Sequence, residues 1–205
     1  MTARVLIGCE RSGVIREAFR AVGADAWSCD LEAAEDGSPH HLQCDIFEAL
    51  KQEWRGFVVH PECRYLSSSG LHWNKRRPGR EQLTEAAVAF ALACWRAGVP
   101  HVCLENPIGR LSRFMGKATQ IVQPYQFGED ASKATCFWLR GLPPLRPTGF
   151  VEPRLVDGRP RWGNQTDGGQ NKLAPSKHRS MDRARTYPGI ARAMASQWWG
   201  IIDGK

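Results

Sequence analysis

Short, mostly apolar runs alternate along the chain with stretches of helical periodicity, and polar turns separate the two. Apolar runs of this length are typical of strands buried on both faces of a sheet. They predict strands at residues 4–9, 25–29, 57–59, 99–104, 121–127 and 136–139.

One long stretch has the periodicity of a helix. Between residues 81 and 98 apolar side chains recur at intervals of three and four, and Gly98 and Pro100 follow. This pattern predicts an amphipathic helix that covers one face of the sheet. The sequence also predicts helices at 14–22 and 190–199, and a short one from Asp45 to about residue 50. Together these elements predict a Rossmann-like α/β sheet with helices on both faces.

Glycine and proline dominate a long segment after the last predicted strand. A connection of this length without secondary structure is uncommon inside a compact domain. We therefore predict a catalytic domain at 1–146, a small irregular segment at 147–186, and a C-terminal helix at 187–205 that packs back on the first domain. The irregular segment carries side chains suited to base edges and phosphates, namely Trp162, Asn164, Gln165, Gln170, Asn171, Lys172 and Arg179.

Composition narrows the class of protein. The chain has 205 residues, of which 42% are hydrophobic and 24% charged, as in ordinary globular proteins. No apolar stretch approaches the length of a membrane span, and no basic and apolar leader opens the sequence, so we expect a cytoplasmic protein. The seven cysteines form no CxxC pair and no zinc-like cluster with histidine, so we expect reduced thiols and no metal.

The charge is unevenly distributed. The net charge is +7, yet the first 50 residues hold four basic and nine acidic side chains, so the remainder is strongly basic. Basic residues concentrate between Lys75 and Arg80 and again in residues 151–192. A basic surface of this size is typical of proteins that bind a phosphate backbone, although the solvated faces of ordinary enzymes look similar.

Cys63 stands directly after an apolar run, in the sequence His60-Pro61-Glu62-Cys63. Open α/β sheets place their chemistry just beyond the carboxyl ends of strands. Most cysteines are structural, but this one is followed by a polar serine-rich stretch rather than by a core helix. The position predicts a thiolate nucleophile on a stiff turn.

Three other polar positions follow predicted strands near the start of the chain. Residues 8–13 form a glycine turn between strand and helix, which is a weak signal for nucleotide binding because the spacing is not GxGxxG. Asp30 ends the second strand, where such folds bind a ribose hydroxyl, although it would serve equally well to cap a turn. Asp45 fits either the adenine edge of a cofactor or the N-cap of the following helix.

Glu105 and Asn106 follow the strand predicted at 99–104. A carboxylate buried at a strand end has its pKa raised, and this is the property that a proton donor needs at neutral pH. The sequence therefore predicts a second catalytic position at this strand end.

These motifs together resemble those of the DNA cytosine-5 methyltransferases, particularly their short phage and prophage branch. The resemblance spans nearly the whole chain. Its motifs are VLIGCERSG, Trp27-Ser28-Cys29-Asp30, Gln43-Cys44-Asp45, His60-Pro61-Glu62-Cys63, Leu104-Glu105-Asn106-Pro107, residues 135–139 and residues 187–195.

The resemblance implies an S-adenosylmethionine-dependent methyltransferase fold and a monomeric enzyme, from a bacterial host or a phage, that acts on a cytosine flipped out of double-stranded DNA. Cys63 would add to cytosine C6, Glu105 would protonate or hydrogen-bond N3, and Asn106 would shape the pocket. The cofactor residues implied are Gly8, Cys9, Glu10, Ser12, Gly13, Asp30, Leu31, Asp45, Ile46, His60 and Pro61. The DNA contacts expected are Lys75, Arg76, Arg77, Arg80, Lys133, Lys172 and Arg179.

Two departures from that family keep other functions open. Glu62 replaces the proline that usually precedes the nucleophile, and a carboxylate beside the thiol should raise its pKa, with Arg64 as a possible offset. The recognition region is also much reduced, which favours short or loosely defined target sites. The alternatives are a related pyrimidine-modifying enzyme with another acceptor or transferred group, and a catalytically silent DNA-binding protein on a methyltransferase scaffold.

Overall fold

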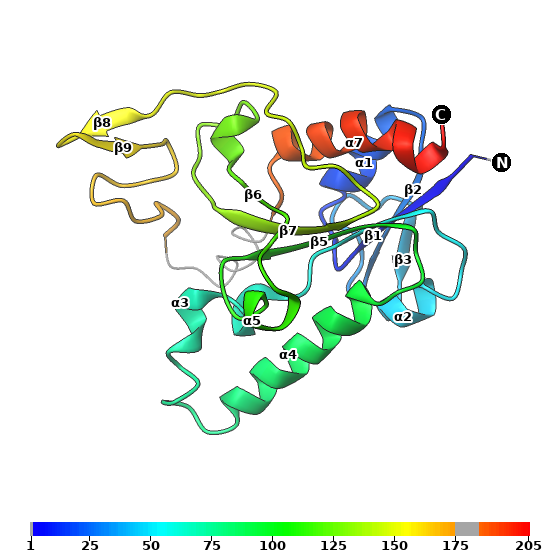
Figure 1. Ribbon diagram of the computed structural model, residues 1–205, viewed down its shortest axis with the longest axis horizontal. Coiled ribbons are helices and arrows are strands. Elements are labelled where there is room, and N and C mark those ends of the chain that lie inside the picture. Colours follow the sequence, from blue (N-terminus) through cyan, green and yellow to red (C-terminus); the bar gives the residue numbers. More distant parts are fainter. Residues whose placement is uncertain (1, 175–184) are drawn as a thin grey trace.

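A seven-stranded sheet lies at the centre of the computed structural model, which describes residues 2–174 and 185–205 (Figure 1). The strand order is β3-β2-β1-β4-β5-β7-β6. The strands are β1 (Arg4–Gly8), β2 (Asp25–Asp30), β3 (His41–Gln43), β4 (Gly56–Val59), β5 (His101–Pro107), β6 (Gln120–Val122) and β7 (Thr135–Arg140).

The first five strands run parallel, whereas β7 is antiparallel to both of its neighbours, β5 and β6. The carboxyl ends of β1 to β5 therefore meet at one edge of the sheet. The strand order reverses between β1 and β4, and such a switch point is where open α/β sheets bind their ligands. This architecture confirms the predicted α/β fold class.

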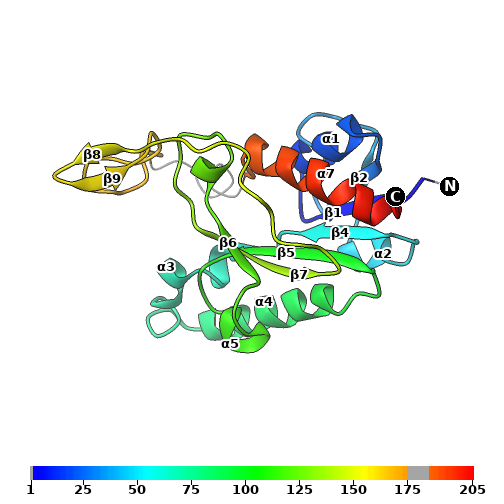
Figure 2. The same ribbon diagram turned by 45° about the horizontal axis from the view of Figure 1, so that its top comes forward.

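Helices cover both faces of the sheet (Figure 2). Helices α1 (Val14–Ala21) and α7 (Pro188–Asp203) lie on one face, and α2 (Ile46–Ala49) and α4 (Arg80–Trp95) lie on the other. Alternate residues of β1 divide between the two layers, because Val5 and Ile7 pack with α1 and α7 while Leu6 packs with α2 and α4. Burial of each such side chain contributes about 1.5–3 kcal/mol to stability.

The C-terminal helix is longer than the sequence suggested and forms part of the core. Trp198 is fully buried, and its indole nitrogen donates a hydrogen bond to the carbonyl oxygen of Pro143 at 2.9 Å. The helix packs against α1 over much of its length. No helix in the described part of the chain combines the length and the apolar character that a membrane crossing requires.

The predicted strand at 121–127 is wrong beyond Val122. Pro124 begins a short 3-10 turn, Pro124–Gln126, because proline has no amide hydrogen to contribute to a strand ladder. The side chain of Gln126 accepts a hydrogen bond from the backbone of Gln123, which stabilises this turn. Two short helices, α3 (Ser68–Leu71) and α5 (Ser112–Met115), were not predicted.

The segment expected to be irregular contains a two-stranded hairpin, β8 (Arg154–Val156) and β9 (Arg159–Arg161), which projects away from the sheet (Figure 2). Asp157 and Gly158 both have positive φ, at 50° and 71°, as a two-residue hairpin turn requires. Asn164 anchors the segment by exchanging two hydrogen bonds with the backbone of Ser132, at 3.0 Å each. The division into three regions remains a prediction.

Candidate active site

The turn that carries Cys63 and the end of β5 lie side by side at the carboxyl edge of the sheet. In the register of β4 and β5, Val59 pairs with Leu104, so His60 and Glu105 each lie one residue beyond the same paired position. Cys63 begins a 3-10 turn, Cys63–Tyr65, three residues further on. The sheet therefore brings together two motifs that are about forty residues apart in the sequence.

Hydrogen bonds fasten the Cys63 turn to the segment after β5. The Asn106 side chain, only 1% exposed, donates from Nδ2 to the carbonyl oxygen of Pro61 at 2.8 Å. Further along, the amide of Ser68 donates to Ile108 at 3.0 Å and the amide of Arg110 donates to Leu66 at 2.7 Å. The role predicted for Asn106 in shaping the pocket is compatible with this bond, which holds the Cys63 turn in place.

Glu105 pairs with His60. Their side chains are 15% and 12% exposed, and Nδ1 of His60 lies 3.2 Å from Oε2 of Glu105. Burial by itself raises the pKa of Glu105, but the His60 hydrogen bond and the positive charges of His60 and Lys133 outweigh it and lower the pKa. The expectation of a raised pKa at Glu105 is therefore wrong, because the sequence pattern showed burial but not these partners.

The thiol of Cys63 is half-buried, and its pKa is raised. Burial is the largest cause, the Glu105 carboxylate is the next, and the charge of Lys133 acts in the opposite direction. Glu62 also raises the pKa, but it contributes less than Glu105. Two details thus differ from the expectation. The carboxylate that raises the Cys63 pKa most is Glu105 rather than Glu62, and the cation that lowers this pKa is Lys133 rather than Arg64.

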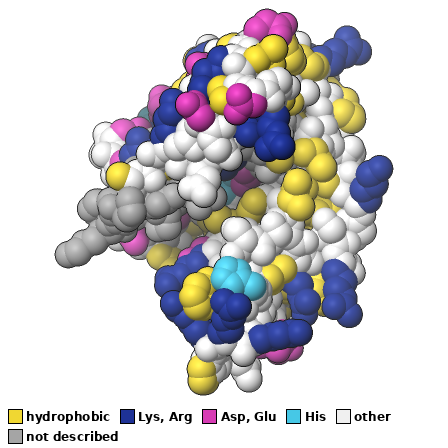
Figure 3. Space-filling model, turned by 90° about the vertical axis from the view of Figure 1, so that its left-hand side faces the viewer, with side chains coloured by type: hydrophobic (Ala, Val, Ile, Leu, Met, Phe, Trp, Pro, Cys, Tyr) yellow, Lys and Arg dark blue, Asp and Glu magenta, His cyan; other side chains and the backbone are white. Residues whose placement is uncertain are grey.

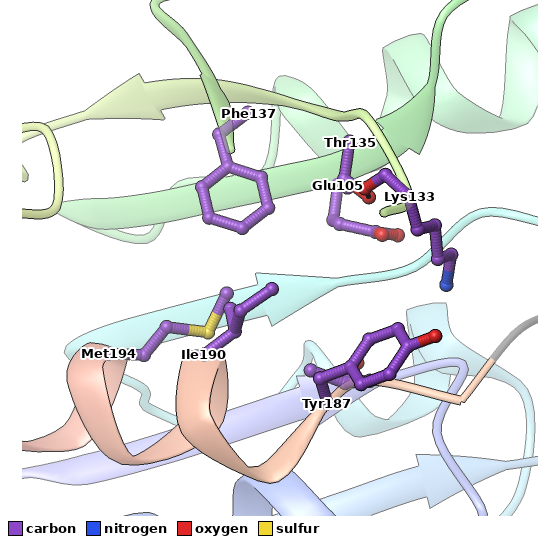
Figure 4. Close-up of a pocket in the computed structure, with 8 residues that line it drawn as sticks. Glu105, Lys133, Thr135, Phe137, Tyr187, Ile190 and Met194 are labelled. Carbon is purple, nitrogen blue, oxygen red and sulfur yellow. Dashed lines mark hydrogen bonds between the residues drawn. The ribbon is translucent and has the colours of Figure 1, made fainter. Parts of the chain in front are cut away.

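A small cavity adjoins these groups (Figure 4). Glu105 and Lys133 line one side, and Tyr187, at the start of α7, faces them from the other. Lys133 also donates a hydrogen bond to the carbonyl oxygen of Arg185 at 3.2 Å. The cavity volume of about 10 Å³ matches a single water molecule and is too small for a pyrimidine ring.

The glycine turn joins β1 to α1 in a conformation that constrains its residues. Cys9 and Gly13 have positive φ, at 57° and 73°. The side chain of Glu10 caps the helix, because its Oε1 accepts hydrogen bonds from the Ile15 amide and the Ser12 hydroxyl, both at 3.0 Å. Its Oε2 is buried and has no partner among the described residues. One oxygen of Glu10 is thus available to a ligand with a hydrogen-bond donor.

Asp30 and Asp45 have the local roles that the sequence left open. Oδ1 of Asp30 accepts the amide of Glu32 at 3.0 Å, and Oδ1 of Asp45 accepts the amide of Phe47 at 2.8 Å as the N-cap of α2. These bonds occupy one oxygen of each carboxylate, so they do not prevent ligand binding by the other. Leu31, beside Asp30, is an apolar side chain with 72% of its surface exposed.

The predicted DNA contacts divide into several groups. Lys75, Arg76 and Arg77 are exposed between α3 and α4, and Lys172 is exposed beyond the hairpin. Figure 3 shows Lys and Arg side chains gathered at the top and the bottom of one face, with a recess of mostly uncharged surface between them. Lys133 lies apart from these groups in the wall of the cavity, and Arg179 lies outside the described residues.

Arg80 does not fit its predicted role as a DNA contact. It is 8% exposed, and its guanidinium donates to the carbonyl oxygen of Arg64 at 3.0 Å and lies 4.9 Å from the ring centroid of Tyr65. A buried arginine so engaged supports the Cys63 turn from α4. This role could not be predicted from sequence, because Arg80 follows closely on a run of exposed basic residues.

Trp73 is an aromatic residue that the sequence reasoning missed. It is 36% exposed in the basic segment, and the guanidinium carbon of Arg77 lies 4.5 Å from its ring centroid. The signal in the sequence was an aromatic residue two positions before Lys75-Arg76-Arg77, a combination typical of nucleic-acid-binding surfaces. In the part of the chain that the structure describes, no three His, Cys, Asp or Glu side chains form a group that could hold a metal ion.

No protein-family model matches the chain, and no curated protein matches it either. Among solved structures, the chain is similar to a protein named as a DNA modification methyltransferase encoded within a prophage of Escherichia coli. The TM-score is 0.48, with 14% identity over 76% of this chain and 54% of the other. It is also similar to the methyltransferase EhMeth of Entamoeba histolytica, with a TM-score of 0.48 and 12% identity over 74% and 58% of the two chains. The chain thus spans little more than half the length of either structure.

Proposed function

We propose that this chain is a DNA cytosine-5 methyltransferase, which transfers a methyl group from S-adenosylmethionine to a cytosine flipped out of double-stranded DNA. The observation that carries the proposal is the meeting of Cys63 and Glu105 at the ligand-binding edge of the sheet. Two hydrogen bonds, His60 to Glu105 at 3.2 Å and Asn106 to Pro61 at 2.8 Å, join the Cys63 turn to the end of β5, and the Glu105 carboxylate raises the pKa of the Cys63 thiol. A thiol and a carboxylate so arranged suit attack on a pyrimidine ring and stabilisation of the resulting charge.

Cytosine C5 is too weak a nucleophile to accept a methyl group without activation. Addition of the Cys63 thiolate to C6 moves electron density onto C5 and N3 and makes C5 nucleophilic. The raised pKa of Cys63 means that the free protein holds mostly the thiol at neutral pH. Lys133 favours the thiolate, so its charge assists the first step.

Glu105 and Asn106 would have separate roles. Glu105 would hydrogen-bond cytosine N3, where negative charge develops during the addition, through a proton held between the two atoms. Asn106 would keep the Cys63 turn within reach of C6 through its bond to Pro61. This division of roles explains why the side chain of Asn106 is directed toward the turn and is almost completely buried.

The residues at the switch point fit S-adenosylmethionine, which supplies an electrophilic methyl group when bound. The buried, unpartnered Oε2 of Glu10 suits an ammonium group. The remaining oxygens of Asp30 and Asp45 suit ribose and adenine, and the exposed Leu31 would pack on an apolar ring face. The same set includes Gly8, Ile46 and Pro61, which bound this edge of the sheet.

Double-stranded DNA would lie across the basic face in Figure 3. Base flipping is needed because C6 of a stacked cytosine is out of reach of Cys63. Glu105 and Lys133, which line the small cavity, would then face the flipped base.

The test is to incubate the purified protein with S-adenosylmethionine and cytosine-containing duplex DNA, and to measure 5-methylcytosine by nucleoside mass spectrometry. We expect product from the wild type and none from Cys63→Ser. Cys136→Ala is the control, because the charge of Glu105 also raises the pKa of Cys136, which is buried in β7 and has no proposed role. This variant should retain activity.

Two results would replace the proposal with an alternative. Methylation of free deoxycytidylate without methylation of DNA would indicate another acceptor. Salt-sensitive DNA binding with no product on either substrate would indicate a silent DNA-binding protein. Product from Cys63→Ser would exclude Cys63 from the reaction.

A further inference from the structure

The proposed chemistry needs a proton at Glu105 that the free carboxylate does not hold. Cytosine N3 takes up a proton or a strong hydrogen bond when the thiolate adds to C6. Glu105 accepts a hydrogen bond from His60, and His60 and Lys133 together keep the Glu105 pKa below the ordinary value of 4.5. Glu105 is therefore ionised at neutral pH, and the proton must come from a neighbouring group.

His60 is the neighbour placed to provide it. Its Nδ1 lies 3.2 Å from Oε2 of Glu105, and an ionised carboxylate can only accept, so Nδ1 carries the hydrogen. Its Nε2 is buried and has no partner among the described residues. No backbone carbonyl or second side chain in that part of the chain bonds to Nε2, so Glu105 is the partner that orients the ring.

We propose that His60 and Glu105 act as one proton-carrying pair, and that this pair supplies the proton that cytosine N3 receives as Cys63 adds to C6. The inference rests on the proposed methyltransferase function and assigns His60 a role other than the cofactor contact expected from sequence. His60 does not touch the base in this scheme, so it is a positioning residue that acts through Glu105.

The step balances in atoms and charge. The Cys63 thiol first releases its proton to solvent, and the thiolate sulfur then forms a bond to C6 with a lone pair. The electrons of the C5–C6 double bond move into a C4–C5 double bond, and those of the C4–N3 double bond move to N3. The Nδ1 proton of the His60 imidazolium passes to Oε2 of Glu105, and a proton passes from the Glu105 carboxyl to N3. The pair is left as a carboxylate and a neutral imidazole that carries its hydrogen on Nε2, and Nδ1 recovers a proton when N3 releases it at the end of the reaction.

The other charged and titratable groups around the pair come from four parts of the fold. Lys133, just before β7, and Tyr187, at the start of α7, line the same cavity as Glu105. Cys63 lies in the turn after β4, and Glu10 lies two residues beyond Gly8, the β1 residue that pairs with Val59.

The decisive variant is His60→Asn. Asparagine can still donate from a nitrogen near the position of Nδ1, but it cannot carry an exchangeable extra proton. We expect the rate of 5-methylcytosine formation at neutral pH to fall about 100-fold, the lower range for loss of a general acid. We also expect the variant's rate to rise as the pH is lowered, because Glu105 must then take its proton from solvent.

A double-mutant cycle separates this role from a structural one. If both residues belong to one proton path, His60→Asn combined with Glu105→Gln should be no slower than Glu105→Gln alone. His101→Gln is the control, because His101 lies on the same strand as Glu105 but at the other end, bonded to the Gly141 carbonyl at 2.8 Å. It should leave the pH profile unchanged. His60→Gln serves as a second variant if His60→Asn unfolds.

The contrary results are distinct. A His60→Asn rate within about threefold of the wild type and with the same pH profile would overturn the proton role. So would a tenfold weaker affinity for S-adenosylhomocysteine with a normal rate at saturating cofactor, since that result would return His60 to the cofactor site. Absence of product from the wild type would instead refute the proposed function itself.

Discussion

Replacing Asn106 with alanine tests how the nucleophile turn is held. The Asn106 side chain is 1% exposed, and its bond to the carbonyl oxygen of Pro61, at 2.8 Å, directly connects β5 to the Cys63 turn. Asn106→Ala leaves that carbonyl without its donor in a place that water does not reach.

The magnitude follows from the unpaired carbonyl. A buried acceptor that loses its donor costs about 1–3 kcal/mol of stability. For a chain of this length each kcal/mol shifts the melting temperature by about 2–4 °C, so the central value of about 2 kcal/mol corresponds to a fall of about 4–8 °C. We expect the rate of methylation to fall about 100-fold as well, because misplacing a nucleophile by about 1 Å has an effect of this size.

The assay is thermal unfolding by calorimetry, followed by 5-methylcytosine formation at a temperature where the variant is folded. Asn171→Ala is the control, because Asn171 makes one exposed bond, to the Leu173 amide, and should change stability by less than about 0.5 kcal/mol. If Asn106→Ala melts with the wild type and methylates at the wild-type rate, the Asn106 bond does not hold the turn.

Three further outcomes follow from the same site. At any given pH below the thiol pKa, alkylation of Cys63 in the free protein should be faster in Glu105→Gln and slower in Lys133→Met than in the wild type, because the two charges shift that pKa in opposite directions. Peptide mass spectrometry measures both rates, and equal rates would exclude an effect of these charges on the thiol. The lowered pKa of Glu105 adds stability that is present above about pH 4.5 and is lost as the pH falls through the pKa of the folded state. The free energy of unfolding, measured with urea, should therefore fall less steeply at acid pH in Glu105→Gln than in the wild type. Trp73→Ala should weaken DNA binding by about 1–3 kcal/mol at constant salt if its ring stacks on a base, whereas unchanged affinity would leave only the neighbouring cations as contacts.

The sequence predicted the sheet well where apolar runs were unbroken. Strands β1 and β4 and most of β5 are buried on both faces, and burial of that kind leaves a local apolar pattern. The pattern failed at 121–127, where apolar residues recur up to Phe127 but Pro124 begins a 3-10 turn and the strand ends at Val122. The hairpin after residue 153 was missed although Asp157-Gly158 is a turn signal, because its flanking strands are too exposed to show apolar alternation.

The sequence predicted which polar residues stand at the ends of strands, but not which side chains they contact. Cys63, Glu105 and Asn106 each follow an apolar run, so their positions at one edge follow from parallel strands. The partners of these residues come from distant segments of the chain, so no local sequence pattern indicates them. His60 follows β4 and contacts Glu105 in the neighbouring strand β5. Lys133 lies just before the antiparallel strand β7. These partners lower the pKa of Glu105, so the raised pKa predicted from burial alone was wrong.

The proposed reaction requires the sulfur of Cys63 to bond to a cytosine. Duplex DNA that carries 5-fluorocytosine at the target position allows this bond to be detected directly. Fluorine at C5 cannot leave as a cation, so a productive enzyme with S-adenosylmethionine should remain attached to the DNA through the cysteine. We expect a denaturant-resistant complex, with the nucleotide on the peptide that contains Cys63, and no complex from Cys63→Ser. If the wild type binds this DNA, yields no such complex and leaves Cys63 unmodified, the central claim is contradicted.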